Sequence, residues 1–239
     1  MPDTRQHRGA HPDDALLFSA AQMPTLQTAG NEFAALLTWG YAPPSALKLV
    51  GDRHGLTVRQ RLALSRAICS DQARDARLAA CLPIERVAGQ DLMIDGFNLL
   101  ITIEAALSGG VILRCRDGCL RDLASVHGTY RAVAETERAL RVIGEMLAAF
   151  APQSVTWLFD APVSNSGQMA RAIREEAARC GWAWQAETVM NPDAALAAAP
   201  RIVVSADSAV LDRAARWVNL GACVLARHLS GAWMLDFGS

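Results

Sequence analysis

Apolar residues in the first third of the chain recur at the spacing of an α-helix. Between residues 31 and 39 they stand at Phe33, Leu36 and Leu37, which share one helical face. Residues 57–60, Thr-Val-Arg-Gln, have the capping-box pattern that begins a helix. The pattern predicts a small all-helical domain over residues 23–86, with helices at 31–39, 45–50, 58–69 and 72–82, preceded by a flexible polar tail at 1–22.

Two of these helices flank a turn that contains Gly51 and Gly55, which is an arrangement also found in helix-turn-helix proteins. We favour an ordinary helical bundle, because no further sequence signal supports the helix-turn-helix. Residues 41–80 carry seven basic and three acidic side chains. This excess of positive charge makes the helical domain a candidate surface for nucleic acid or for a protein partner.

From residue 87 onward, short apolar runs alternate with helical patterns of 10–15 residues, which is typical of an α/β fold. We expect a parallel sheet flanked by helices over residues 87–239. The predicted strands are 91–95, 155–160, 182–189, 202–205 and 223–226, with an added edge strand at 233–237. A hairpin is predicted at 111–115 and 119–123, and helices at 98–107, 132–150, 168–180, 193–199 and 208–218.

Three of the predicted strands end in an aspartate, at Asp95, Asp160 and Asp207. The carboxyl ends of parallel strands meet in one crevice, which is where ligands bind in open α/β sheets. Carboxylates that converge there repel one another unless a cation neutralises them. The sequence therefore predicts that Asp95, Asp160 and Asp207 hold Mg²⁺ or Mn²⁺ through oxygen ligands. Each aspartate alone could instead be a helix cap.

Polar residues that could bind a metal ion or a phosphate group lie close to these aspartates in the sequence. Asn98, which is predicted to bind the substrate by orienting its phosphate group, follows Asp95 by three positions, and Asp212 follows Asp207 by five. Asp212 is predicted to be a catalytic carboxylate near the metal, or else a solvated residue paired with Arg216. The loop after Asp160 is predicted to cradle a phosphate group at a helix start, or merely to cap that helix, through Ser164, Asn165 and Ser166.

The segment from Leu113 to Arg131, which includes most of the predicted hairpin, is rich in groups that could contact a phosphate backbone. Arg116, Arg121 and Arg131 are predicted to grip the substrate, and His127 to bind it or act as a general acid or base. An exposed hairpin with alternating polar positions would explain most of these arginines equally well. Cys115 and Cys119 flank the hairpin turn but lack the further ligands of a zinc site.

Composition narrows the chemistry further. Lys48 is the sole lysine and lies outside the region of the aspartates, so Schiff-base and Walker-type lysine mechanisms are excluded there. An aspartyl-phosphate phosphatase would need a second aspartate where Phe97 stands. The six cysteines are scattered, and no apolar run is long enough to cross a bilayer. We therefore expect reduced thiols and a cytoplasmic protein without membrane contact.

A strand that ends in Asp95-Gly-Phe-Asn98, a second that ends in Phe159-Asp160 and the run Ser205–Asp212 resemble the PIN-like nucleases, especially their NYN branch. The resemblance covers residues 90–226 and implies a PIN-like, Rossmann-related sheet with an acidic pocket that binds Mg²⁺ or Mn²⁺ and cuts RNA. The whole chain is also similar to a prokaryotic family of uncharacterised function that joins a small helical domain to such a domain. The arginine-rich hairpin departs from plain PIN-like domains.

These observations favour a metal-dependent phosphodiesterase, most simply a ribonuclease with RNA as substrate. A binding or regulatory protein that holds nucleic acid or a phosphorylated ligand without cleaving it is the alternative. A phosphatase or phosphotransferase that uses Asp95 as nucleophile is a third hypothesis. A homo-oligomer or a protein partner is expected to involve the helical domain.

Overall fold

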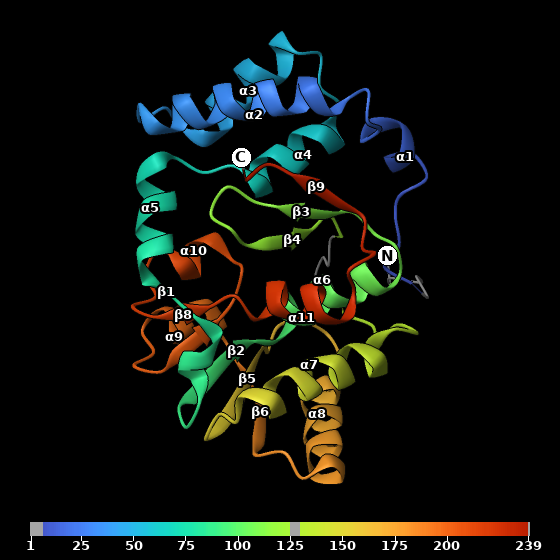
Figure 1. The fold of residues 1–239 in the computed structure, drawn as a ribbon, viewed down its shortest axis with the longest axis vertical. Helices are drawn as coiled ribbons and strands as arrows, with labels where there is room; N and C mark the ends of the chain where they lie inside the picture. The colour runs from blue at the N-terminus through green and yellow to red at the C-terminus, as the bar shows by residue number, and fades with distance from the viewer. Residues whose placement is uncertain (1–6, 125–129, 239) are drawn as a thin grey trace.

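The computed structural model describes residues 7–124 and 130–238. Its centre is a six-stranded sheet in the order β1-β8-β7-β2-β5-β6, in which every neighbouring pair is parallel. The predicted α/β class, with a parallel sheet flanked by helices and an N-terminal helical region, is confirmed (Figure 1). The strands are β1 (Cys81–Leu82), β8 (Trp217–Val218), β7 (Ile202–Val204), β2 (Asp91–Asp95), β5 (Ser154–Asp160) and β6 (Trp184–Val189).

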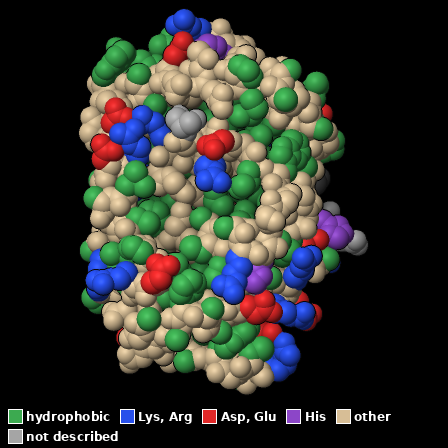
Figure 2. Space-filling model, viewed as in Figure 1, with side chains coloured by type: hydrophobic (Ala, Val, Ile, Leu, Met, Phe, Trp, Pro, Cys, Tyr) green, Lys and Arg blue, Asp and Glu red, His purple; other side chains and the backbone are tan. Residues whose placement is uncertain are grey.

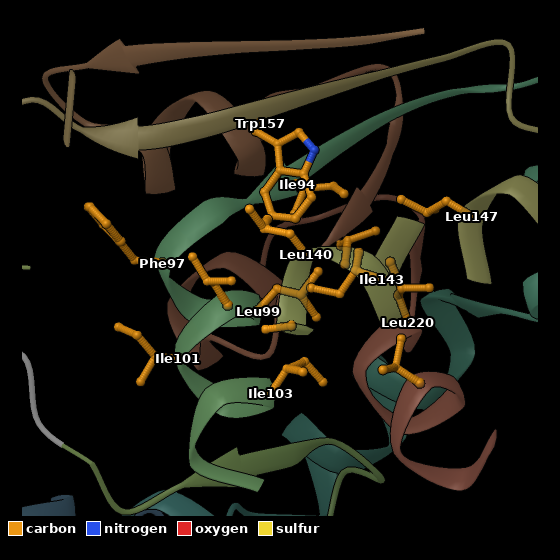
Figure 3. Close-up of a cluster of buried hydrophobic side chains, with 14 of the residues drawn as sticks. Ile94, Phe97, Leu99, Ile101, Ile103, Leu140, Ile143, Leu147, Trp157 and Leu220 are labelled. Atoms are coloured by element: carbon orange, nitrogen blue, oxygen red, sulfur yellow. The ribbon is translucent and has the colours of Figure 1, made fainter. Parts of the chain in front are cut away.

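Helices cover both faces of this sheet. One face packs against α6 (Gly96–Leu107), α7 (Thr136–Phe150), α8 (Ser166–Cys180) and α11 (Leu220–His228). In this layer Leu99 and Ile103 of α6 face Leu140 and Ile143 of α7 (Figure 3). The other face packs against the short helices α9 (Pro192–Ala197) and α10 (Ser208–Leu211). Burial on two faces explains why the central strands are nearly continuous apolar runs.

A second core lies between the N-terminal helices and a small three-stranded sheet of order β4-β3-β9. Apolar side chains of both parts enter this core, among them Phe33 from α2 and Leu113 from β3. The helical layer thus lies at one end of the molecule, and the small sheet separates it from the large one (Figure 1). The helices of this region are α2 (Met23–Thr38), α3 (Pro43–Arg53), α4 (Val58–Ala67) and α5 (Asp71–Ala80). The strands of the small sheet are β3 (Ile112–Arg114), β4 (Leu120–Asp122) and β9 (Met234–Asp236).

Local sequence patterns correctly predicted where several helices and strands begin or end. The capping box at the start of α4 is present, with Thr57 and Gln60 each bonding the other's backbone. The turn between β3 and β4 uses Gly118 at φ 78°, a left-handed conformation that glycine adopts readily. The part of the chain that the structure describes has no helix long and apolar enough to cross a membrane.

Two predicted elements near the C-terminus are wrong. The expected helix at 208–218 ends after one turn as α10, and Trp217 and Val218 then join the sheet as β8. The expected strand at 223–226 is instead part of α11. Asn219 explains the second error, because its side chain accepts a hydrogen bond from the Ala222 backbone N–H and so begins a helix directly after β8.

Residues 7–22, which the composition predicts to be part of a flexible tail, pack against the fold. They carry the short helix α1 (Asp14–Leu17), and the side chains of Arg8, Asp14 and Phe18 are buried. Arg8 forms an ion pair with Glu104 of α6, whose second oxygen accepts a hydrogen bond from the hydroxyl of Tyr130 at 2.7 Å. Apolar and charged anchors therefore hold this segment in place.

Gly96 sets how closely α6 approaches β5. A Cβ at this position would lie 2.8 Å from the carbonyl oxygen of Leu158 and closer still to the ring of Phe159. We expect Gly96→Ala to lower the free energy of unfolding by about 1–3 kcal/mol, because the strand or the helix must shift. Urea denaturation would measure the change.

Gly167 provides the matched control, since it is also early in a helix and a Cβ there meets no atom within 4 Å. Gly167→Ala should leave stability unchanged or raise it by up to about 1 kcal/mol. Equal destabilisation by the two variants would contradict the close-approach argument.

Candidate functional site

A cavity of about 440 Å³ opens at the carboxyl edge of β2, β5 and β7. Asn98, Asp160 and Asp207 contribute to its floor, and α4 and β4 of the other core close it on the opposite side. This is the position at which parallel α/β sheets bind ligands. The remaining lining residues are Ser65, Arg66, Phe97, Ile101, Thr102, Arg121, Asp122, Ala124, Val163, Ala206 and Ser208.

Asp95 lies just beneath this cavity and is buried. Its Oδ2 accepts a hydrogen bond from the Ser205 hydroxyl at 2.8 Å, and its Oδ1 accepts one from the Asn98 backbone N–H at 3.4 Å. Burial, with a smaller contribution from the charges of Asp193 and Asp207, raises the pKa of Asp95 to about 7, although the two hydrogen bonds oppose the shift. Asp95 therefore joins the ends of β2 and β7 and does not line the cavity.

Asp160 and Asp207 do line the cavity. Burial and the charge of Asp193 raise the pKa of Asp160. Asp207 also caps α10, since its Oδ1 accepts hydrogen bonds from the backbone N–H groups of Ala209 at 2.8 Å and Val210 at 3.2 Å. The capping interpretation and the placement at the sheet edge are thus both correct for Asp207.

Asp193, in the first turn of α9, is a carboxylate that the sequence analysis did not assign to the site. Burial and the charge of Asp207 raise its pKa, and its own charge raises those of Asp95 and Asp160. Four aspartates therefore interact electrostatically at one edge of the sheet. The sequence did contain a clue to Asp193, because it lies a few residues after the end of β6. Strand β6 is thus a fourth strand whose end is followed by an acidic residue.

The donor atoms of this set determine whether it can bind a divalent cation. Among residues 7–124 and 130–238, no group of three or more Asp, Glu, His or Cys side chains is close enough to hold a metal ion. Asp95 in particular has both oxygens engaged in hydrogen bonds. Asp160 and Asp207 remain as cavity-lining carboxylates, and two carboxylates with water and a substrate phosphate match the way Mg²⁺ is usually bound.

Asn98 connects the floor of the cavity to the neighbouring strand. Its Oδ1 accepts a hydrogen bond from the Ala206 backbone N–H at 2.8 Å. The Ser205 hydroxyl, which donates to Asp95, accepts in turn from the Asp207 backbone N–H at 3.0 Å. These bonds fix the backbone after β7, so that Asp207 faces the cavity in a defined position.

The arginines predicted to grip a substrate are largely engaged within the fold. Arg116 donates to the Cys69 carbonyl at 3.0 Å and to Asp71 at 2.5 Å. Arg121 reaches the cavity wall, but it donates to the Ala206 carbonyl at 2.6 Å and pairs with a buried aspartate of the hairpin turn. Arg131 is exposed, and its carbonyl accepts a hydrogen bond from Arg8 at 2.9 Å.

Asp212 and the loop after β5 also differ from the prediction. Asp212 accepts a hydrogen bond from Arg77 of α5 at 2.7 Å and is not among the residues that line the cavity. Asn165 donates to the Tyr130 carbonyl at 2.7 Å, and the Ser164 carbonyl accepts from the Tyr130 N–H. Ser166 is buried at the first position of α8. His127 lies outside the described residues.

The basic excess of the helical region is neutralised within the molecule. All seven basic residues between 41 and 80 form salt bridges, for example Arg66 with Asp122 and Arg77 with Asp117. Charged groups of opposite sign accordingly lie near one another on the face shown in Figure 2. This pairing weakens the prediction of a basic nucleic-acid surface on these helices.

The hairpin cysteines are buried thiols. Burial raises the pKa of Cys115 to about 11 and that of Cys119 well above its ordinary value. Both are free in the structure. A raised thiol pKa disfavours the reactive thiolate, so these residues act as small apolar side chains of the two cores.

Comparison with known proteins identifies related sequences. Residues 84–223 match the family described as "Domain of unknown function (DUF5616)", and residues 25–79 match "Protein of unknown function (DUF434)". The chain is 32% identical over 152 residues to "Uncharacterized protein MJ0935" of Methanocaldococcus jannaschii, which covers 64% of this chain and 73% of that protein. No solved structure matches the chain. None of these descriptions names an activity.

The raised pKa of Asp95 predicts a pH-dependent stability in metal-free buffer. The unfolded pKa is near 3.8 and the folded pKa is about 7, so the contribution of Asp95 is most favourable below pH 4 and is lost as the pH rises through 7. Asp95→Asn removes this titration while the amide can still bond Asn98 and Ser205. Relative to wild type, the variant should gain up to about 4 kcal/mol of stability between pH 4 and pH 8.

Urea unfolding at a series of pH values would measure this difference. Asp236→Asn, at an exposed carboxylate on β9, serves as the control and should follow the wild-type profile. A constant difference between Asp95→Asn and wild type across this range would contradict the raised pKa.

Proposed function

The chain belongs to the family described as "Domain of unknown function (DUF5616)", and we propose that its cavity is the site of a metal-dependent phosphodiesterase that cleaves RNA. The observation that carries this proposal is the electrostatic repulsion among aspartates at the carboxyl edge of the sheet, where Asp193 acts on Asp95 and Asp160, and Asp207 acts on Asp95 and Asp193. Asp160 and Asp207 also line an open cavity. A hard divalent cation would relieve that repulsion. The resemblance of residues 90–226 to PIN-like nucleases supports the same chemistry.

Asp160 and Asp207 are the residues proposed to hold Mg²⁺ or Mn²⁺. The charge of Asp193 raises the pKa of Asp160, and the charge of Asp207 raises the pKa of Asp193, so Asp193 would add to the negative potential that attracts the cation. A bound cation of this kind supplies charge neutralisation at the scissile phosphate and lowers the pKa of a bound water. Asp95 is proposed to be a positioning residue, which corrects its predicted role as a ligand.

The side chains of the protein itself bind and orient the substrate in this proposal. Asn98 and Arg121 hold the backbone at Ala206 through its N–H and its carbonyl, respectively. Ser65 of α4 and Ser208 of α10 offer hydroxyl groups among the residues that line the cavity. Arg66, which is partly exposed beside Asp122, is the cation on the α4 side of the cavity and is proposed to face the phosphate backbone.

Binding without cleavage is the second candidate function, because no three-carboxylate group is found in the described residues. The same cavity would then hold a phosphorylated ligand or RNA together with one cation. A phosphotransfer role for Asp95 as nucleophile is disfavoured, since this carboxylate is buried and both of its oxygens are bonded.

RNA cleavage in the presence of Mn²⁺ tests the proposal. We expect the wild type to cleave single-stranded RNA, and Asp160→Asn or Asp207→Asn to lower the rate by about a hundredfold or more, because each removes a charge from the cation site. Asparagine is a good helix cap, so Asp207→Asn should keep α10 intact. Cleavage would be followed on a labelled oligonucleotide.

Asp236→Asn again serves as the control and should cleave at the wild-type rate. Equal rates for Asp160→Asn and wild type would overturn the assigned cation site. Mn²⁺-dependent RNA binding by the wild type without any cleavage would favour the second candidate function.

A further inference from the structure

A second cavity, of about 670 Å³, adjoins the acidic one. It lies between the α2–α3 connection and the helices α4 and α5, and Ser65 and Ser208 line both cavities. The two cavities therefore adjoin at these two serines, and together they are referred to as the cleft. Both fall in the size range of small-molecule sites.

The two parts of the cleft differ in chemistry. The acidic part carries Asp160 and Asp207, whereas most of the side chains that line the second part are apolar. The exposed ring of Tyr41 lies at the second part, with Pro43 and Pro44 at the start of α3 beside it. The other lining residues are Phe33, Leu37, Gly40, Ala42, Leu47, Ile68, Cys69, Ser70, Ala73 and Arg77.

We propose that this second cavity is a base-binding subsite, in which a nucleobase stacks on Tyr41 while its phosphate reaches the acidic cavity past Ser65 and Ser208. A nucleotide unit is the ligand whose chemistry matches both parts, because it joins a flat apolar ring to a phosphate group. Stacking of bases on aromatic side chains is the usual way in which proteins hold single-stranded nucleic acid. The placement of the phosphate rests on the proposed function, whereas the stacking of the base on Tyr41 is inferred from the second cavity alone.

The subsite gives the helical region a role that its paired basic residues do not supply. Recognition there would depend on the ring of Tyr41 and on neighbouring hydroxyls such as that of Ser70, and not on free positive charge. It also restricts the substrate class, since a base held in the cleft must be unpaired. Single-stranded RNA and free nucleotides would bind, whereas duplex RNA would not.

Fluorescence anisotropy of a labelled single-stranded RNA hexamer, with the full-length protein and Ca²⁺ as the hard cation, tests the subsite. We expect Tyr41→Ala to weaken binding by about 5- to 150-fold, which corresponds to the loss of one stacked base. Tyr41→Phe keeps the ring and should bind within about twofold of wild type. A hexamer of the same backbone without bases should bind equally to wild type and Tyr41→Ala.

Trp39→Ala provides a matched control, because Trp39 is an exposed aromatic residue two positions away that lines a different groove between α2 and α3. It should bind like wild type. Competition by adenosine monophosphate would show that a free nucleotide also occupies the subsite, and duplex RNA of equal length should not compete.

Three results would overturn the subsite: unchanged affinity in Tyr41→Ala, equal losses for the normal and base-free hexamers, or no hexamer binding by wild type. The failure of the proposed function would look different. In that case hexamer binding would still depend on Tyr41, while Asp160→Asn would leave Mn²⁺-dependent cleavage unchanged.

Discussion

One buried carboxylate connects the two cores of this molecule and binds an arginine that lines the cavity. Asp117, in the turn between β3 and β4, is fully buried and accepts hydrogen bonds from Arg77 of α5 and Arg121 of β4. Burial raises the pKa of this carboxyl, and the two guanidinium groups outweigh that effect and hold it below its ordinary value. Loss of one partner from such a buried pair typically costs about 3–5 kcal/mol, because the remaining charge stays uncompensated.

This network of ion pairs uses Arg77 and Arg121 for contacts within the protein. Arg77 extends it to Asp212, and Arg121 extends it to the carbonyl of Ala206 at the end of β7. The helical region, the hairpin and the carboxyl edge of the large sheet are thus joined through charged groups. The guanidinium groups of Arg77 and Arg121 could bind a phosphate backbone, but here they hold parts of the fold together. The aspartates at the carboxyl edge of the large sheet therefore have few nearby positive charges to balance them.

The parts of the fold that follow from local pattern could be predicted from the sequence. Strands such as β2 and β5 are buried on both faces and appear as nearly continuous apolar runs, and their terminal aspartates lie at the expected edge. The run at 223–226 has no local feature that separates a buried strand from a buried helix, so the Asn219 cap decided its structure. The partner of Asp212 lies 135 positions away on α5, and no spacing rule reveals such a pair.

The site residues, too, could be predicted only where they follow from local sequence pattern. Asp160 and Asp207 could be placed because each follows a strand, whereas Asp193 reaches the site only through the path that α9 takes across the sheet. The hydroxyl of Ser205, directly after the neighbouring strand β7, donates a hydrogen bond to Asp95, and sequence order does not specify this pairing. The adjoining apolar cavity requires the α2–α3 connection to meet α4 and α5, which is a property of helix packing alone.

The central claim of this account is that Asp160 and Asp207 together hold a divalent cation. Electron paramagnetic resonance of Mn²⁺ titrated into the protein measures this directly, because bound and free Mn²⁺ give different signals. The account predicts saturable Mn²⁺ binding by the wild type and by Asp236→Asn, and binding at least tenfold weaker in Asp160→Asn and in Asp207→Asn. Absence of saturable binding in the wild type, or equal binding by the two cavity variants and wild type, would contradict it.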